Sequence, residues 1–298
     1  MAVTSFAMLA RGRHTLQAHR TAMNVVSHNM ANSGVDGYSR QEAHYVAQNA
    51  HRSREGYIGN GVDIDRLVRH NSPMIERRLD LDTSTNNESR ERLEILAQME
   101  VVYTDESYSI GPGITDFFNS WRNLSQNPAS TISRRETIAR GQDLAARINS
   151  AAQRIQALRS DQDANLAGYA EEVSSLASTV ARLNREIQDA ESTFQAANDL
   201  RDERQRAIRG LSELIDINTY SDQAGNVLVG LGDGTSLVSG RRSGRLSASP
   251  DPNNSNLMGV FFVDADGTSR RGAITADITG GRIGGLIASR DGFAADAL

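Results

Sequence analysis

The chain has 298 residues, which is enough for two domains of ordinary size or for one elongated molecule. Its formal net charge is -5 and its isoelectric point is about 5.7, so it lacks the basic surplus that nucleic-acid binding requires. All 32 basic residues are arginine and no residue is cysteine, which excludes disulfides, thiolate metal sites and cysteine nucleophiles.

The low apolar content favours an extended shape over a compact enzyme. Aromatic residues make up 5% of the chain, and the mean hydropathy is -0.47. A rod of thin helices has more surface per residue than a compact domain, so it needs fewer apolar residues. Residues 1–10 lack the pattern of a Sec signal peptide, and no apolar stretch is long enough to span a bilayer. These criteria alone favour a cytoplasmic protein.

The first predicted element is a helix over residues 2–32 that carries a heptad seam. Its apolar positions recur every seven residues at Leu9, Leu16, Met23 and Met30, with Gly12, His19 and Val26 on the alternate positions. Because so narrow a seam cannot hold a helix by itself, it predicts a partner helix in a distant segment or in another subunit. The glycines of residues 33–37 end the helix.

The next segments alternate between loops and helices. Residues 37–61 are polar and rich in glycine, which predicts an extended or loop segment, and the alternation within 62–67 predicts a short strand. A proline at the first helical position favours a helix over 73–102. We expect a break over 108–113 and then a short helix over 114–124, which carries the only tryptophan.

Residues 130–194 predict a helix of unusual length, preceded by a break at Asn127 and Pro128. Its apolar residues keep a spacing of three and four over much of the segment, including Ile148, Ala152, Ile155, Leu166, Tyr169, Val173, Leu176, Val180, Leu183, Ile187, Ala190 and Phe194. One continuous helix would be roughly 96 Å long at 1.5 Å per residue. The alternative is a break near 161–164, where the stripe weakens. Sustained heptads favour coiled-coil packing, with 71–102 as the partner.

A charged helix over 199–214 precedes a region of different character. Alternating apolar residues predict strands near 215–219, 227–231 and 260–263. Three turns separate the apolar runs, at Gly225-Asn226, Gly232-Asp233-Gly234 and Asp266-Gly267. A final helix over 283–298 shows no terminating signal, so we expect the chain to correspond to the N-terminal portion of a longer protein.

These elements predict a mainly α fold, an elongated helical coiled-coil or bundle rod with a small antiparallel β region near 215–280. We expect three segments. Residues 1–60 form an N-terminal axial helix and loop, 61–214 form the long helical rod, and 215–298 form β-hairpins and the start of a truncated helix.

No pattern supports catalysis, a metal site or a cofactor. The six histidines all lie in the first quarter of the chain without an HExxH or His-x-His arrangement. Residues 264–267 lack the downstream glutamate of a calcium loop, and 230–234 lack the Lys-Ser/Thr of a phosphate-binding loop, so both predict hairpin turns. The carboxylates of the long helix are interpreted as a solvated face. We therefore expect a protein that is not an enzyme.

Two runs near the N-terminus carry a resemblance to a known family. The sequence Ser27-His28-Asn29-Met30-Ala31-Asn32, followed by Gly37-Tyr38-Ser39-Arg40-Gln41, resembles the N-terminal signature of flagellar axial proteins, and its Gly-Tyr-Ser-Arg-Gln ending resembles the hook-associated protein 1 (FlgK) family. Later blocks are similar to the same family at residues 59–78, 116–128, 198–204, 236–240 and 281–291. The pair Val35-Asp36 is a mild departure in a loop.

The resemblance implies an extracellular structural component of the bacterial flagellum, an adapter at the hook-filament junction that assembles by helix packing. It implies exit through the flagellar export apparatus instead of the Sec pathway. The implied partners are identical subunits in a ring, the hook protein, hook-associated protein 3, and the export apparatus with its chaperone. The family binds that chaperone through a C-terminal part that we expect to be missing here. No nucleic acid or membrane is implied.

The residues expected at the assembly interface are Leu9, Leu16, Met23, Val26, Met30, Asn29, Asn32, Gly37, Tyr38, Arg40 and Gln41. By the resemblance, the apolar members pack on the family's C-terminal helix and on neighbouring subunits, and Tyr38, Arg40 and Gln41 fix the loop. The alternatives are another axial protein such as a hook or rod subunit or hook-associated protein 3, a coiled-coil module that regulates or chaperones export, and an enzyme such as a peptidoglycan hydrolase.

Overall fold

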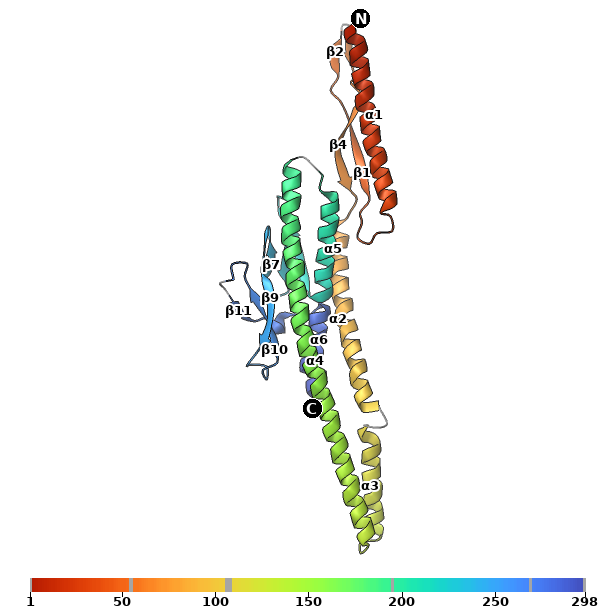
Figure 1. The fold of residues 1–298 in the computed structure, drawn as a ribbon, viewed down its shortest axis with the longest axis vertical. Helices are drawn as coiled ribbons and strands as arrows, with labels where there is room; N and C mark the ends of the chain where they lie inside the picture. The colour runs from red at the N-terminus through yellow and green to blue at the C-terminus, as the bar shows by residue number, and fades with distance from the viewer. Residues whose placement is uncertain (1, 54–55, 105–108, 194–195, 268–269, 297–298) are drawn as a thin grey trace.

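The computed structural model describes residues 2–53, 56–104, 109–193, 196–267 and 270–296. The molecule is elongated and mainly α-helical, with the N-terminal helix at one end and a pair of helices at the other (Figure 1). We call residues 2–71 the head and residues 72–296 the rod. Within the described residues, no helix is long and apolar enough to cross a membrane.

The head consists of one helix and a β-ribbon. Its elements are α1 (Ala2–Ala31), β1 (Gln41–Ala47), β2 (His51–Ser53), β3 (Gly56–Ile58) and β4 (Val62–Arg69). Strands β1 and β4 pair antiparallel, as do β2 and β3, and α1 lies against the ribbon, with Ala18 and Val25 buried. Residues 37–61, expected to form an extended or loop segment, are extended over β1, β2 and β3 and pair there as strands. Most residues of β1 are exposed, so this strand does not show the buried apolar alternation by which a strand is recognised in a sequence.

The rod is built on four helices, α2 (Pro73–Thr104), α3 (Ile110–Gln126), α4 (Thr131–Ser192) and α5 (Asn198–Leu214). Helix α4 runs for 62 residues without the break considered near 161–164. The stripe weakens there because polar side chains face protein: Gln162 is buried, and Asp163 accepts hydrogen bonds from the Met258 amide and from Arg290. The predicted stripe ends at Phe194, which lies outside the described residues.

Helix α3 begins earlier than the predicted break over 108–113 allows. It includes Gly111, Pro112 and Gly113 in its first turn. A proline there sacrifices no hydrogen bond, because the first amide groups of a helix have no intrahelical acceptor. Residues 105–108 lie outside the described part of the chain.

The β region contains two antiparallel sheets. Their strands are β5 (Ile217–Ser221), β6 (Val227–Leu231), β7 (Ser236–Ser239) and β8 (Arg242–Ser243) in the first, and β9 (Arg245–Pro250), β10 (Met258–Val263) and β11 (Arg270–Ala273) in the second. The predicted turns carry left-handed glycines, Gly225, Gly234 and Gly267. The chain then forms η1 (Thr275–Asp277), α6 (Gly281–Ala288), the π-helical η2 (Ser289–Phe293) and α7 (Ala294–Asp296) in place of one final helix.

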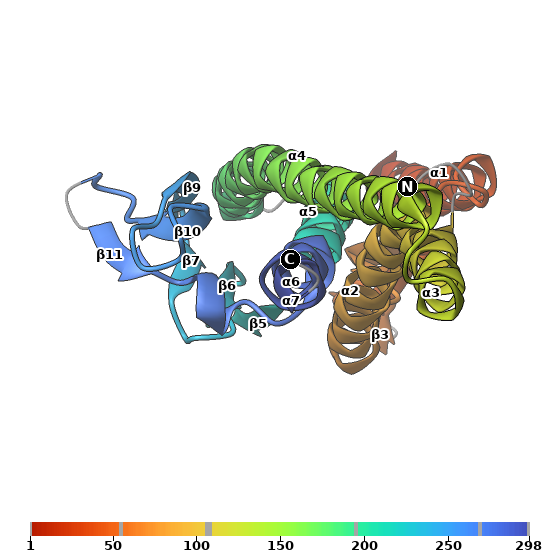
Figure 2. The same cartoon turned by 90° about the horizontal axis from the view of Figure 1, so that it is seen from below.

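One apolar core joins α2, α4, α5, α6 and both sheets. Leu166, Val173, Ile208 and Leu286 are almost completely buried in it. Seen along the long axis, α6 lies between α2 and the sheets (Figure 2). Helix α2 therefore packs mainly on α6 and α5, whereas α4 packs mainly on α3, α5 and β9, so the expected α2–α4 coiled coil is only a minor contact.

The predicted segment boundaries do not follow this packing. The boundary at 60/61 falls between β3 and β4, so the pairing of β1 with β4 crosses it. The boundary at 214/215 follows α5, and the core continues across it through Leu214 and Ile215. Within the described residues, that core includes no head residue.

Substitution of Arg290 tests how much the stability of the core depends on a buried ion pair. Its side chain is fully buried, and it donates to Asp163 at 2.6 Å, to Asp291 at 2.7 Å and to the Met258 carbonyl at 2.7 Å. We expect Arg290→Ala to lower the free energy of unfolding by about 3–5 kcal/mol, because two carboxylates lose their cation inside the protein. Urea denaturation followed by circular dichroism measures this change.

The matched control is Arg242→Ala, which removes an exposed ion pair with Asp266. Its expected cost is below about 1 kcal/mol, because water solvates both charges. Equal effects of the two substitutions would contradict the structural role assigned to Arg290.

Candidate assembly surface and head–rod joint

The outer face of α1 is an exposed apolar surface. Leu9, Leu16, Met23 and Met30 are between 71% and 73% exposed, and Val26 is 57% exposed. The opposite face of the helix packs on the β-ribbon, so this seam has no partner in the described part of the chain. Near the C-terminal end of α1 the surface is hollowed by about 510 Å³, between the helix and Tyr45. A row of such side chains is large enough to mark a protein-binding face.

The loop after α1 is folded back on the helix by Asn29. The Asn29 amide donates to the Gln41 carbonyl at 2.8 Å, and its oxygen accepts from the Tyr38 hydroxyl at 2.8 Å and from the Gln41 amide at 2.9 Å. Gly37 has a left-handed φ of +73°, and a Cβ there would lie 2.6 Å from Cγ of Arg206. The loop therefore turns tightly while passing close to α5.

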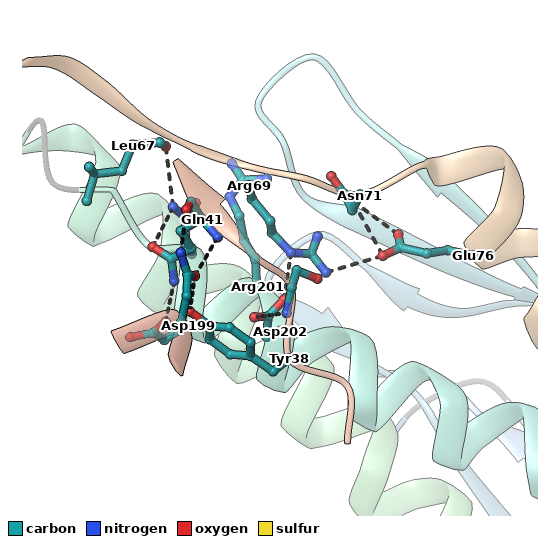
Figure 3. Close-up of polar contacts among 12 residues, drawn as sticks. Tyr38, Gln41, Leu67, Arg69, Asn71, Glu76, Asp199, Arg201 and Asp202 are labelled. Carbon is teal, nitrogen blue, oxygen red and sulfur yellow. Dashed lines mark hydrogen bonds and ion pairs between the residues drawn. The ribbon is translucent and has the colours of Figure 1, made fainter. Parts of the chain in front are cut away.

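Polar contacts from the first turns of α5 hold the head on the rod (Figure 3). Gln41 donates to Asp199 at 2.7 Å and accepts from Asn198 at 3.1 Å, and Asn198 also donates to the Leu67 carbonyl at 3.3 Å. Carboxylates near a helix N-terminus, such as Asp199 and Asp202, interact favourably with its dipole. The start of α5 thus binds both β1 and β4.

Asp202 lies at the centre of these contacts. One of its oxygens accepts from Arg69 at 2.6 Å and the other from the Ser39 amide at 2.9 Å. Arg69 also donates to Glu76 at 3.2 Å, so it links β4, α5 and α2. Only 11% of the Arg69 side chain and 5% of the Asp202 side chain are exposed, so removing either partner would leave a buried charge without compensation. We call these contacts of Asn29, Ser39, Gln41, Arg69, Glu76, Asn198, Asp199 and Asp202 the joint.

Two ionisable groups beside the joint are shifted by burial. Burial raises the pKa of Tyr38, and the nearby charges of Asp199 and Asp202 raise it further. Asp80 of α2 is buried next to Gln205, and its pKa is raised to about 6, mainly by burial. The Gln205 hydrogen bond opposes this rise. A polar pocket of about 440 Å³ lies between these elements.

The structure separates the predicted interface residues into two groups. Asn29, Gly37, Tyr38 and Gln41 lie together in or beside the joint, whereas the apolar seam residues point to solvent. Asn32 caps the end of α1 by donating to the His28 carbonyl at 2.9 Å. Arg40 is exposed and lies 3.5 Å from Glu42, outside the contacts with α5. The role of these residues in assembly remains a prediction.

Sequence reasoning does not assign Arg69, Glu76, Asn198, Asp199 or Asp202 to the site. The run at 198–204 stands out in the sequence only as a block of family resemblance, and its polar residues fit a solvated helix start equally well. The signal available in the sequence is the position of Asn198, Asp199 and Asp202 at the start of a predicted helix, where Asn and Asp side chains commonly accept hydrogen bonds from backbone amides.

Two of the histidines each lie against one carboxylate. His28 lies 3.4 Å from Asp199 and His70 lies 2.7 Å from Glu42, so each faces a single carboxylate. Among the described residues, no group of three or more histidine, aspartate or glutamate side chains could hold a metal ion.

Three comparisons relate the chain to known proteins. The family model of the flagellar hook-associated protein FlgK helical domain matches residues 96–298. Flagellar hook-associated protein 1 of Salmonella typhimurium is 26% identical over 254 residues, which cover 84% of this chain and 45% of that protein. The same protein of Escherichia coli is 25% identical over 281 residues (92% and 50%), and that of Bacillus subtilis is 28% identical over 236 residues (76% and 46%).

A solved structure supports the same relationship. The flagellar hook junction protein FlgK from Burkholderia pseudomallei matches with a TM-score of 0.65 and 25% identity, over 72% of this chain and 39% of that chain. The chain spans about half the length of the curated relatives described above.

Asp202→Ala tests whether the joint holds the head on the rod. The substitution leaves Arg69 without its shortest ion pair and the Ser39 amide without an acceptor. We expect the free energy of opening the joint to fall by about 3 kcal/mol while the rod stays folded. Amide hydrogen exchange of β4 and of the first turn of α5 measures it. The control Asp36→Ala, whose carboxylate is exposed and 3.7 Å from Arg209, should change it by less than about 0.5 kcal/mol.

Asp80 predicts a pH dependence of stability. The pKa of Asp80 is raised to about 6 in the folded protein. Between about pH 4 and pH 6 the folded state therefore holds a proton on Asp80 that the unfolded state has lost. Stability should therefore fall as the pH rises from about 4 to about 6 and stay low above that. Asp80→Asn should remove this component and raise the free energy of unfolding at pH 7 by about 2–3 kcal/mol. Urea titrations at several pH values measure it, and identical profiles for both proteins would refute the assignment.

Proposed function

The chain belongs to the flagellar hook-associated protein FlgK family, and from this premise we propose that it is a structural component of the bacterial flagellum that joins the hook to the filament. The family is structural and is not a family of enzymes. The curated relatives are named hook-associated protein 1, and the solved neighbour is named a hook junction protein.

The observation that carries the proposal is the exposed apolar seam of α1. Five large apolar side chains lie along one helix face in water, and the joint fixes the orientation of that helix on the rod. Exposing such a face is unfavourable in an isolated molecule, so the seam is best explained by burial in an assembly. Leu9, Leu16, Met23, Val26 and Met30 are the proposed contact residues.

The magnitude of this burial favours a cooperative assembly. Full burial of a leucine or methionine stabilises by about 1.5–3 kcal/mol, so five side chains contribute on the order of 10 kcal/mol. Association costs about 4–15 kcal/mol in lost translational and rotational freedom. A single seam contact therefore roughly balances its cost, and the proposed ring of identical subunits would multiply the contacts formed by each additional subunit.

The proposed partners follow from the position at the junction. They are identical subunits in a ring, the hook protein on one side and hook-associated protein 3 on the other. Export through the flagellar apparatus would place the protein outside the cell without a Sec signal peptide. In this proposal the head, residues 2–71, lines the inner tube, and the rod with its β region surrounds it.

Deletion of the gene tests the proposal in the cell. We expect electron microscopy to show hooks without filaments and flagellin to accumulate in the medium, because the filament would lack its attachment point. Complementation separates this protein from hook-associated protein 3. Loss of the hook itself would place the protein further inward, and normal swimming flagella would refute a junction role.

Leu16→Asp tests the seam. A carboxylate at a position that is 71% exposed in the isolated chain but buried in the assembly should abolish incorporation and leave the thermal unfolding of the rod unchanged. Immunogold labelling of purified hook-filament junctions measures incorporation. The control Ile132→Asp changes an equally exposed residue, at 77%, at the start of α4, outside the proposed seam, and should incorporate normally. Junctions that contain the Leu16 variant would contradict the assignment.

A further inference from the structure

Arg204 of α5 is a buried cation whose hydrogen-bonding capacity is only partly used. Its exposed fraction is 6%, and its Nη1 donates to Oδ1 of Asn184 at 2.8 Å and to the Gly225 carbonyl at 3.1 Å. Both partners are neutral. Within the described residues, Nε and Nη2 of Arg204 make no hydrogen bond and its guanidinium makes no ion pair. Burying a charge in this way is costly, because neither its donors nor its charge is fully compensated.

The remaining donors of Arg204 open into the polar pocket of about 440 Å³ beside the joint, which we call the joint pocket. Its lining comes from β4, α2, α5 and the strands β5 and β6. Nε and Nη2 of Arg204 are accessible there, unlike Nε of Arg209, which is sealed inside the protein without a partner. The volume lies in the range of pockets that hold small ligands. An uncompensated cation therefore borders a cavity large enough for a counter-ion.

Three further arginines line the joint pocket, and one of them is also unpaired. Arg69, shown with its partners in Figure 3, is neutralised by the carboxylates of the joint. Arg201 donates to both oxygens of Glu191 at 2.9 Å. Arg77 of α2 is exposed and makes no ion pair within the described residues. The pocket thus offers two cations, Arg77 and Arg204, that the fold does not neutralise.

The surroundings of Arg204 are more positive than negative. Burial is the main cause that lowers the pKa of Arg204 to about 10, and the nearby positive charges of Arg201 and Arg69 contribute to the fall. The carboxylates of Glu191 and Asp222 oppose it without cancelling it. Like charges held this close disfavour one another. An anion placed among them would remove that repulsion.

The carboxylates that line the joint pocket do not cancel its positive charge. Glu76 faces Arg69 and Glu191 faces Arg201, so both are already paired. Asp80 accepts from Gln205 and is the remaining acidic group. The four arginines and three carboxylates of the lining together carry a formal charge of +1. A negatively charged ligand is therefore favoured over a cation.

Hydroxyl groups add uncharged donors from another direction. Thr219 and Ser221 line the joint pocket from β5, and side chains two residues apart on a strand point to the same side. The donors of the pocket thus come from α5, α2 and β5. A tetrahedral oxyanion presents acceptors in several directions and pairs strongly with the guanidinium fork, whereas a carboxylate presents its two oxygens in one plane.

We propose that the joint pocket binds one inorganic tetrahedral oxyanion of the phosphate or sulfate class, held by Arg204 and Arg77 with hydroxyl donors from β5. Leu67 and Arg69 of β4 line the same pocket, so the anion stabilises the contact between head and rod when it binds. The site goes beyond the junction role and does not depend on it, because it concerns how one molecule holds its own head.

Titration calorimetry of the whole chain with sodium phosphate and with sodium sulfate, at constant ionic strength set by sodium chloride, tests the site. We expect saturable one-to-one binding of both anions and at least tenfold weaker binding of acetate. Absence of saturable phosphate and sulfate binding would overturn the proposal, and acetate that binds as tightly as sulfate would overturn the choice of a tetrahedral ligand.

Two variants place the anion in the joint pocket. Arg204→Lys keeps the charge but loses the planar fork, and Arg77→Gln removes a surface charge without touching the core; each should weaken sulfate binding about tenfold. The matched control Arg78→Gln changes the neighbouring arginine of α2, which lies 3.8 Å from Asp82 and does not line the pocket, and should leave binding unchanged. Equal weakening by Arg77→Gln and Arg78→Gln would overturn the assignment, whether or not the Arg204 variant folds.

Amide hydrogen exchange tests the effect on the joint. Millimolar phosphate should slow exchange of the β4 amides in the unmodified chain and have much less effect in Arg77→Gln, because the variant does not hold the anion. Phosphate excluded from the protein surface would instead slow exchange equally in both proteins. Equal slowing, or unchanged exchange when calorimetry shows the site to be filled, would overturn the proposed stabilisation of the joint.

Discussion

The buried ion pair between Arg69 and Asp202 is the interaction on which the arrangement of head and rod depends. The apolar core of the rod includes no described residue of the head, so that core does not extend across the joint. Asp202 instead fixes the loop through Ser39 and the ribbon through Arg69, while Arg69 reaches Glu76 on α2. Buried polar contacts are directional, so they set an orientation that apolar contacts alone would leave adjustable.

A polar joint also explains why the seam of α1 can remain exposed. If the head were held by apolar contacts, Leu16 and its neighbours would compete for the same burial and could fold back onto the rod. Asn29 and Gln41 satisfy the polar groups of the loop and direct α1 away from the rod. The apolar surface of α1 therefore stays free for the contacts between molecules that we propose.

Helix α4 sets the length of the rod, and the helices and strands that pack on α4 hold it in place. Helix α4 is far longer than a typical helix of a globular domain. Its residue Asp163 accepts hydrogen bonds from the Met258 amide of β10 and from Arg290 of the π-helical segment η2. At a different point, Tyr169 of α4 donates to Glu91 of α2, which also accepts from Arg282 of α6. Three helices therefore share one buried carboxylate, and the sheets on the other side complete the core.

The sequence by itself determined what depends on local pattern. The spacing of Leu9, Leu16 and Met23 located the seam, the apolar stripe over 130–194 indicated the long helix, and glycine-containing turns marked the hairpins. Only the tertiary structure decided which of the polar residues form the joint. Asp202 lies 133 residues after Arg69, and no periodicity connects a carboxylate on a helix to an arginine on a distant strand. Helix periodicity is a property of neighbours in sequence, whereas the partner of a buried charge is chosen by the packing of the whole chain.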